Sequence, residues 1–141
     1  MSVLSKVRFP LTLREQMRRL AEAAYPYEGC GVLIGLPGEV TEVRAGRNLR
    51  GPEERARDRY VLDPGDIMRA ERDADAAGLE VVGFWHTHPD HPSQASRYDA
   101  DHAWPSYCYV IVSVRDGQAV GEQGWILATE APAEFREELL D

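Results

Sequence analysis

The sequence predicts an α/β (α+β) fold in which a central mixed β-sheet is flanked by helices. Three observations lead to this prediction. Apolar residues recur at helical spacing near the N-terminus and again after Asp63-Pro64. Several short segments are rich in aromatic and β-branched residues, as strands are. Turn dipeptides, Pro37-Gly38 and Asp116-Gly117, join two pairs of these segments and predict two hairpins.

The N-terminal half supplies a helix, a hairpin and a second helix. Thr12-Leu13-Arg14-Glu15 has the pattern of a capping box, which predicts that the first helix opens there and ends before Pro26. Residues 29–35 and 40–44 are expected to form the first hairpin. Residues 47–59 are polar and charged and predict a loop, followed by a brief strand over 59–62. Asp63 is expected to cap a helix that has proline at its first position and runs to about Ala77.

The C-terminal half predicts the rest of the sheet. Residues 79–85 are expected to form a strand, and 88–97 a loop. A short helix is predicted over 98–103. Residues 107–114 and 119–127 are expected to pair as the second hairpin. The tail is rich in glutamate and predicts a last short helix or a frayed end.

Size and composition narrow the class of protein. The 141 residues predict a single domain over 1–141, with enough apolar content (43%) for one core. No apolar run is long enough for a membrane span and no secretory signal is visible, so we expect a cytoplasmic protein. The formal charge of −8 argues against a nucleic-acid partner, because phosphate binding needs a basic face. Cys30 and Cys108 are too few for a disulfide framework.

The most informative segment is Trp85-His86-Thr87-His88-Pro89. Successive side chains on a strand point to opposite faces, so His86 and His88 should share one face. Two imidazoles and a carboxylate from the following segment would make three zinc ligands, with the fourth position left for water as in catalytic zinc sites. Zinc lowers the pKa of a bound water to about 7. By itself the histidine pair leaves a second interpretation open, namely two surface histidines at the start of a loop.

The wider pattern resembles a known family. His86-Thr87-His88, seven residues, Ser96, two residues and Asp99 form a spacing similar to the signature of the JAMM metallopeptidases, also called the MPN+ or Mov34/PAD-1 family. The segment from Glu28 to Gly35 is similar to the part of the family that carries its catalytic glutamate. Residues 81–85 and 109–113 resemble strands of the family's sheet. The resemblance spans about residues 11–128.

The resemblance implies a fold, a metal and a role for each site residue. The expected fold is the JAMM/MPN domain, with a layout like that of cytidine deaminases. One Zn²⁺ per chain would be held by His86, His88 and Asp99, although ligands of these types also accept iron and other divalent metals. Glu28 would act as general base and then general acid. Ser96 would donate a hydrogen bond to the oxyanion. Ala95 stands where the family often has proline.

Neighbouring residues offer alternatives. Asp101 competes with Asp99 as a ligand, and the family spacing favours Asp99. His102 is a candidate to orient Asp99, against a plain packing role. Cys30 would share a strand face with Glu28, so it is either a thiol that responds to oxidation near the metal or a buried inert residue, which is the favoured interpretation. Trp104 is expected either to line a substrate groove or to pack in the core.

The short chain resembles the small prokaryotic members of the family that act on ubiquitin-like sulfur-carrier proteins. This resemblance implies hydrolysis of a peptide or isopeptide bond after the carrier's Gly-Gly end, releasing an amino acid such as newly made cysteine or a longer extension. The expected partner is therefore such a carrier, whose tail would add a strand at a sheet edge.

Three other functions compete with this one. The first is a deubiquitinase-like isopeptidase that acts on another ubiquitin-like modifier. The second is a scaffold without metal, which the intact ligand and glutamate positions disfavour. The third is a zinc nucleoside deaminase. That chemistry requires a Pro-Cys-x-x-Cys element, which this sequence does not contain. The oligomeric state, including a homodimer, is left open.

Overall fold

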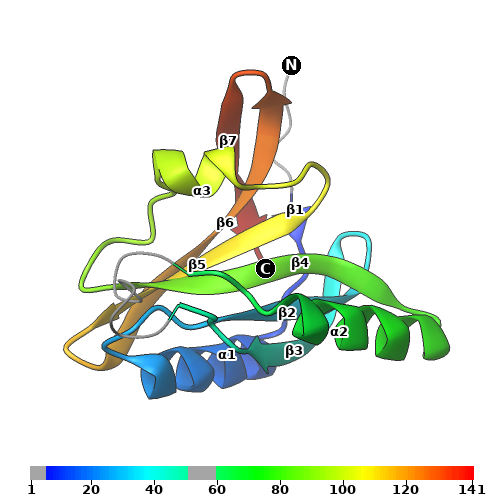
Figure 1. The fold of residues 1–141 in the computed structure, drawn as a ribbon, viewed down its shortest axis with the longest axis horizontal. Helices are drawn as coiled ribbons and strands as arrows, with labels where there is room; N and C mark the ends of the chain where they lie inside the picture. Colours follow the sequence, from blue (N-terminus) through cyan, green and yellow to red (C-terminus); the bar gives the residue numbers. More distant parts are fainter. Residues whose placement is uncertain (1–5, 51–59) are drawn as a thin grey trace.

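The computed structural model describes residues 6–50 and 60–141 (Figure 1). The helices are α1 (Leu11–Ala24), α2 (Pro64–Ala76) and α3 (Arg97–Asp101). The strands are β1 (Lys6–Val7), β2 (Cys30–Leu36), β3 (Glu39–Gly46), β4 (Glu80–Pro89), β5 (Cys108–Arg115), β6 (Gln118–Glu130) and β7 (Ala133–Leu140). Within these ranges no helix is long and apolar enough to cross a membrane.

The strands form one mixed sheet in the order β1-β7-β6-β5-β4-β2-β3. The β4–β5 and β1–β7 pairs are parallel, and the remaining pairs are antiparallel. A parallel bridge between Arg8 and Glu39 links the chain after β1 to β3, so the sheet curls into a nearly closed barrel. Figure 1 shows the β6–β7 hairpin projecting beyond the rest of the sheet, with α3 beside it. The predicted α+β fold with a central mixed sheet is confirmed.

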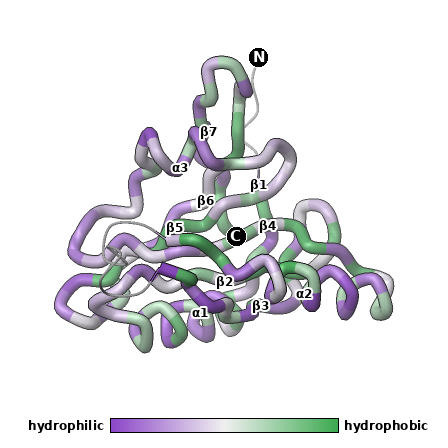
Figure 2. Tube along the Cα trace, viewed as in Figure 1, coloured by the Kyte–Doolittle hydropathy of each residue, from purple (hydrophilic) through white to green (hydrophobic). Residues whose placement is uncertain are grey.

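The two long helices pack on opposite faces of the sheet. Met17 and Ala21 of α1 share one apolar cluster with Leu33 of β2, whereas Ala70 and Ala74 of α2 belong to a second cluster. Strand side chains alternate between the faces, so the neighbours of Leu33 on β2 join the α2 cluster. Figure 2 shows the apolar residues concentrated in the central strands, which are buried on both faces.

Both predicted hairpins are confirmed, and their turns use the expected glycines. β2 and β3 pair across Pro37-Gly38, where Gly38 has φ of 82°. β5 and β6 pair across Asp116 and Gly117, which have φ of 50° and 84°. Positive φ at both central residues is typical of the tight turn whose twist matches that of the flanking strands.

Two sequence predictions were wrong. The capping box at Thr12 does not form, because α1 begins at Leu11 and is capped by Pro10, whose carbonyl accepts from the amides of Leu13 and Arg14 at 3.0 Å each. The glutamate-rich tail is strand β7, neither a helix nor a frayed end. Pairing with β6 and β1, and the contacts of the Phe135 ring with aromatic rings on β5 and β6, outweigh the helical propensity of its glutamates.

Other boundaries moved slightly or fall outside the described chain. β4 continues through His88 to Pro89, where a loop was predicted. α3 begins at Arg97, one residue before the predicted start. The predicted strand over 59–62 is represented by an isolated bridge between Asn48 and Leu62. The greater part of the predicted loop over 47–59 lies outside the described residues.

Candidate metal and catalytic site

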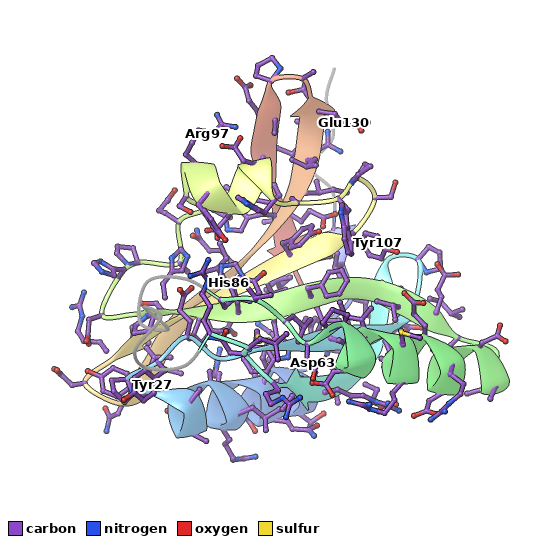
Figure 3. All side chains as sticks on the ribbon, in the orientation of Figure 1. Tyr27, Asp63, His86, Arg97, Tyr107 and Glu130 are labelled. Atoms are coloured by element: carbon purple, nitrogen blue, oxygen red, sulfur yellow. The ribbon has the colours of Figure 1, made fainter. Side chains whose placement is uncertain are left out.

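The two histidines lie near the carboxyl end of β4 and face the same side of the sheet. β4 is an inner strand between β2 and β5, so backbone hydrogen bonds on both edges hold this segment. Register places Cys30 of β2 and Ile111 of β5 opposite His86. The side chain of His86 is 2% exposed and that of His88 is 14% exposed. Figure 3 shows His86 beneath α3, where side chains from the sheet and the helix converge.

Asp99 reaches both histidines from α3. Its Oδ1 lies 3.2 Å from Nε2 of His86, and its Oδ2 lies 3.1 Å from Nε2 of His88. Ser96 caps the helix, with its Oγ accepting from the Asp99 amide at 3.0 Å while its own amide donates to Asp99 Oδ2 at 2.9 Å. The sequence therefore uses a capping box to fix the position of the carboxylate.

A backbone carbonyl orients the second histidine. Nδ1 of His88 lies 2.9 Å from the carbonyl oxygen of Pro92. A carbonyl only accepts, so Nδ1 carries the proton in this contact and the lone pair of the neutral ring is on Nε2, which faces Asp99. Metal-binding histidines are held by this kind of contact. Sequence reasoning missed the role of Pro92, although its place four residues after His88 is compatible with a local turn.

The electrostatics of the three groups follow from burial and from each other. Burial lowers the pKa of His86 and outweighs the opposing effect of Asp99. For His88 burial also acts to lower the pKa, but the Asp99 carboxylate and the Pro92 carbonyl raise it on balance. Burial acts to raise the pKa of Asp99, yet its contacts with both imidazoles hold that pKa well below its usual range. The site thus keeps an ionised carboxylate beside two imidazoles.

The side chain of Glu28, two residues before the start of β2, lies close to the two histidines. Glu28 is 5% exposed, and ligand atoms of Glu28, His86 and His88 all lie within 4.8 Å of one another. The next residue is tied to the histidine strand, because the Gly29 amide donates to Thr87 Oγ1 at 2.9 Å. The structure therefore brings together the five predicted site residues, which are Glu28, His86, His88, Ser96 and Asp99. Glu28 is also a candidate third ligand by this spacing.

The donor set fits a zinc ion. Nε2 of His86 is buried and makes no hydrogen bond of acceptable geometry in the described part of the chain, although Asp99 Oδ1 lies 3.2 Å from it. A buried polar atom of this kind needs an explanation such as a bound ion. Two ligands of one tetrahedral zinc lie about 3.3 Å apart, given bonds of about 2.0–2.1 Å. The contacts of 3.1 and 3.2 Å between Asp99 and the two Nε2 atoms are close to that separation.

Two cavities meet at this point. One, of about 250 Å³, is mostly apolar and is lined by aromatic rings that include Tyr60, Phe84, Trp104 and Tyr109. The other, of about 330 Å³, is more polar, and Glu28, His88 and Ser96 are among its lining residues. Three residues, Tyr60, Tyr98 and Asp99, line both. An extended chain could therefore pass Asp99 with an apolar wall on one side and a polar wall on the other.

Tyr60 is a site residue that sequence reasoning missed. Its ring stacks on the imidazole of His86 with centroids 4.6 Å apart and an interplanar angle of 23°. The stacked ring covers one face of the histidine and contributes to both cavities. Its position just before the Asp63 cap was visible in the sequence, but nothing there placed it beside His86.

The structure decides between several of the alternatives. Asp101 is exposed and pairs with Arg97 at 3.0 Å, which disfavours it as a ligand. His102 stacks on Tyr98 and contacts the Tyr98 carbonyl at 2.9 Å, in keeping with a packing role. Trp104 is 55% exposed and lines the apolar cavity, as the groove interpretation predicts.

Cys30 lies opposite His86 in the β2–β4 register but is a poor candidate for a reactive thiol. The residue is 1% exposed. Burial, followed by the charge of Glu28, raises the pKa of Cys30 to about 12. Because the thiolate is the nucleophile, a thiol with so high a pKa reacts slowly near neutral pH. The inert interpretation is therefore favoured.

Comparison with known proteins shows which proteins this chain is similar to. A family model described as prokaryotic homologs of the JAB domain matches residues 10–127. A protein of Haloferax volcanii named desampylase is 35% identical over 89 residues, which cover 62% of this chain and 63% of that protein. A desampylase of Pyrococcus furiosus is 34% identical over 105 residues, covering 72% and 67%. The chain thus spans less than two thirds of the length of the Haloferax protein.

Solved structures give the same fold. The solution structure of a Salinibacter ruber protein has a TM-score of 0.71 at 36% identity and covers 95% of this chain and 89% of its own. A Desulfitobacterium hafniense protein has a TM-score of 0.80 at 25% identity, covering 96% and 91%. A JAB1/MPN domain protein from Archaeoglobus fulgidus has a TM-score of 0.59 at 16% identity, covering 97% and 99%, which shows the shared fold alone.

Proposed function

The chain belongs to the family of prokaryotic homologs of the JAB domain, and we propose that it is a zinc-dependent peptidase. Its proposed reaction is hydrolysis of the peptide or isopeptide bond after the Gly-Gly end of a ubiquitin-like protein. The observation that carries the proposal is the convergence of His86, His88 and Asp99 beside the buried Glu28.

In this proposal Asp99, His86 and His88 hold the zinc and Glu28 does not. Asp99 contacts both Nε2 atoms, and the Ser96 amide fixes the Asp99 carboxylate in place. Zinc, when bound, acts as a Lewis acid and makes water a better nucleophile at neutral pH. Glu28 is then available for proton transfer. It would not be available if its carboxylate were itself a ligand of the metal.

The chain's own residues supply the proton transfers. Glu28 accepts a proton from the attacking water and passes it to the leaving amine, so that the amine departs neutral. Ser96 donates a hydrogen bond to the oxyanion formed at the scissile carbonyl. Its Oγ already accepts from the Asp99 amide, so the hydroxyl proton is directed away from that amide, and Ser96 lines the polar cavity.

Two relatives named desampylase support a ubiquitin-like modifier as the substrate class. Glycine has no side chain, so a Gly-Gly tail can bring its backbone close to the metal ligands where bulkier residues would collide. A sulfur-carrier protein with such a tail is our preferred substrate. A deubiquitinase-like activity on another ubiquitin-like modifier is the alternative, and the two share one chemistry.

The test is mass spectrometry of ubiquitin-like carriers extended past Gly-Gly, incubated with wild type, Glu28→Gln and His88→Ala, with the zinc content of each protein measured. Wild type should bind one zinc per chain and release the extension. Glu28→Gln should keep its zinc and lose at least about 100-fold in rate, because proton transfer contributes about 10²–10⁴-fold. His88→Ala should lose both. Glu137→Gln, an exposed change on β7, serves as the control.

Each part of the proposal has its own contradicting result. Zinc-loaded wild type that leaves a panel of sulfur carriers and ubiquitin-like proteins uncut would overturn the peptidase assignment. Cleavage by Glu28→Gln at the wild-type rate would remove Glu28 from its role. A wild-type protein without affinity for zinc would instead favour the scaffold function.

A further inference from the structure

Asn48 occupies a position between Glu28 and the wall of the cleft. It follows the end of β3 by two residues, is half-buried, and forms an isolated bridge with Leu62. None of the roles assigned above uses it. Its side chain, however, bonds to two segments that contribute to the site.

The amide side chain of Asn48 makes three hydrogen bonds to backbone groups. Its Nδ2 donates to the carbonyl oxygen of Glu28 at 3.0 Å. Its Oδ1 accepts from the amides of Val61 and Arg50, each at 3.0 Å. A carbonyl can only accept and an amide N–H can only donate, so these partners fix which end of the Asn48 side chain is oxygen and which is nitrogen.

Two of these three hydrogen bonds reach functional elements. Glu28 is the proposed base, and its backbone carbonyl is the group that Asn48 holds. Val61 follows Tyr60, whose ring stacks on His86 and lines both cavities. One side chain therefore spans from the backbone of the base to the backbone beside the cleft wall.

The backbone around Asn48 is itself anchored on α2. The Leu49 amide donates to the Val61 carbonyl at 2.7 Å, and the Asp63 amide donates to the Arg47 carbonyl at 2.9 Å. The Arg47 amide donates to Oδ2 of Asp66 in the first turn of α2 at 2.8 Å. These hydrogen bonds limit the movement of the backbone on both sides of Asn48. The side-chain amide of Asn48 is therefore held in a fixed orientation toward Glu28 and Val61.

We propose that Asn48 is a positioning residue that sets Glu28 against the metal ligands and holds the Tyr60 wall of the substrate cleft. The inference rests on the proposed function, since it assumes that Glu28 transfers protons. It goes beyond that function by linking the base to the substrate-contacting wall through one amide side chain.

Two substitutions separate the two halves of this role. Asn48→Asp keeps an acceptor for Val61 and Arg50 but replaces the donor to Glu28 with an oxygen that repels the Glu28 carbonyl. Asn48→Ala removes both the donor to Glu28 and the acceptor for Val61 and Arg50. The matched control is Thr41→Val, because the Thr41 hydroxyl likewise donates to a backbone carbonyl, that of Ile34 at 3.3 Å, without reaching the site.

The kinetic expectation is a split between kcat and KM. Asn48→Asp should lower kcat about 10–100-fold, as small misplacements of a reacting group do, and change KM by less than about twofold. Asn48→Ala should lower kcat to a similar extent and also raise KM about two- to tenfold, the range of one or two lost hydrogen bonds. Thr41→Val should change neither by more than about twofold.

Two readouts do not depend on activity. Zinc content should stay at the wild-type value in every variant, because the ligands are untouched. Amide hydrogen exchange of Val61 should be faster by about tenfold or more in Asn48→Ala and unchanged in Asn48→Asp, because only the former loses the acceptor. Thermal unfolding is measured to check that each variant is folded. If Asn48→Ala does not fold, Asn48→Asp by itself is sufficient to test the positioning of Glu28.

The contradicting results are distinct from failure of the proposed function. A folded Asn48→Asp with kcat within about twofold of wild type would overturn the positioning of Glu28. Val61 exchange unchanged in a folded Asn48→Ala would overturn the hold on the cleft wall. Failure of the proposed function would show as no cleavage by wild type, and amide exchange would then decide whether Asn48 holds the Tyr60 segment.

Discussion

Thr87, the residue between the two histidines, should contribute to stability through a hydrogen bond on the opposite face of β4. Its side chain points away from the metal site, and its Oγ1 accepts from the buried Gly29 amide at 2.9 Å. Thr87 is 1% exposed, so water cannot replace this partner. Thr87→Val keeps the shape of the side chain while removing the acceptor.

The expected magnitude follows from leaving one buried amide without a partner. Such a loss costs about 1–3 kcal/mol. A decrease of that size lowers the folding equilibrium constant by about 5- to 150-fold. For a chain of this length it corresponds to a drop in Tm of roughly 3–9 °C. Glu28 precedes the freed amide, so we also expect kcat to fall.

The assay is urea unfolding in the presence of a chelator, so that metal binding does not mask the change in the free energy of unfolding. The control is Thr129→Val, because the Thr129 hydroxyl donates to the Pro132 carbonyl at 2.8 Å in an exposed position, where water can substitute. A decrease below about 0.5 kcal/mol for Thr87→Val, or one equal to that of the control, would refute the buried-acceptor argument.

Other predictions address the sheet, the thiol and a charged pair. Gly31→Ala should cost more than about 3 kcal/mol or prevent folding, because an added Cβ would lie 1.9 Å from a carbonyl oxygen of β3. Gly121→Ala should leave the free energy of unfolding nearly unchanged, because a Cβ added at Gly121 meets open space. Equal losses of stability for the two variants in chemical unfolding would contradict this. The raised pKa of Cys30, about 12, means that its thiol form stabilises the fold below about pH 8.5, the ordinary pKa, and that this contribution is lost as the pH rises toward 12. Iodoacetamide should therefore label Cys30 much more slowly in native than in unfolded protein at pH 8, and equal rates would show an accessible thiolate. Arg18→Gln, which breaks an ion pair with a carboxylate on β6 that is 3% exposed, should cost about 1–3 kcal/mol, whereas Arg97→Gln in an exposed pair should cost less than about 0.5.

The local parts of the site could be predicted from the sequence. His86 and His88 share a face because strand side chains alternate, and that prediction holds in β4. The capping box that joins Ser96 to Asp99 was not predicted, because Ser96 was placed in the loop before a helix over 98–103, although the three-residue spacing of the pair is compatible with it. These features depend on the chain over a few residues, where backbone geometry fixes the outcome.

Contacts between distant segments could not be derived in the same way. Glu28 meets the histidines because β2 pairs with β4 in the register that places Cys30 opposite His86. Tyr60 reaches His86 from residues 60–63, which lie before α2 and have little regular structure of their own. Only the resemblance to a known family suggested the first of these contacts, and nothing suggested the second.

The hairpins, the long helices and the shared face of the histidine pair follow from local sequence, because turn chemistry and side-chain periodicity act over a few residues. The tertiary structure decided the strand β7, whose glutamates favour a helix until β6 and β1 offer backbone partners and a place for Phe135. It also decided how Glu28 and Tyr60 meet at His86 and how Asn48 links their segments, because the β2–β4 register and the hydrogen bonds of Asn48 fix those positions.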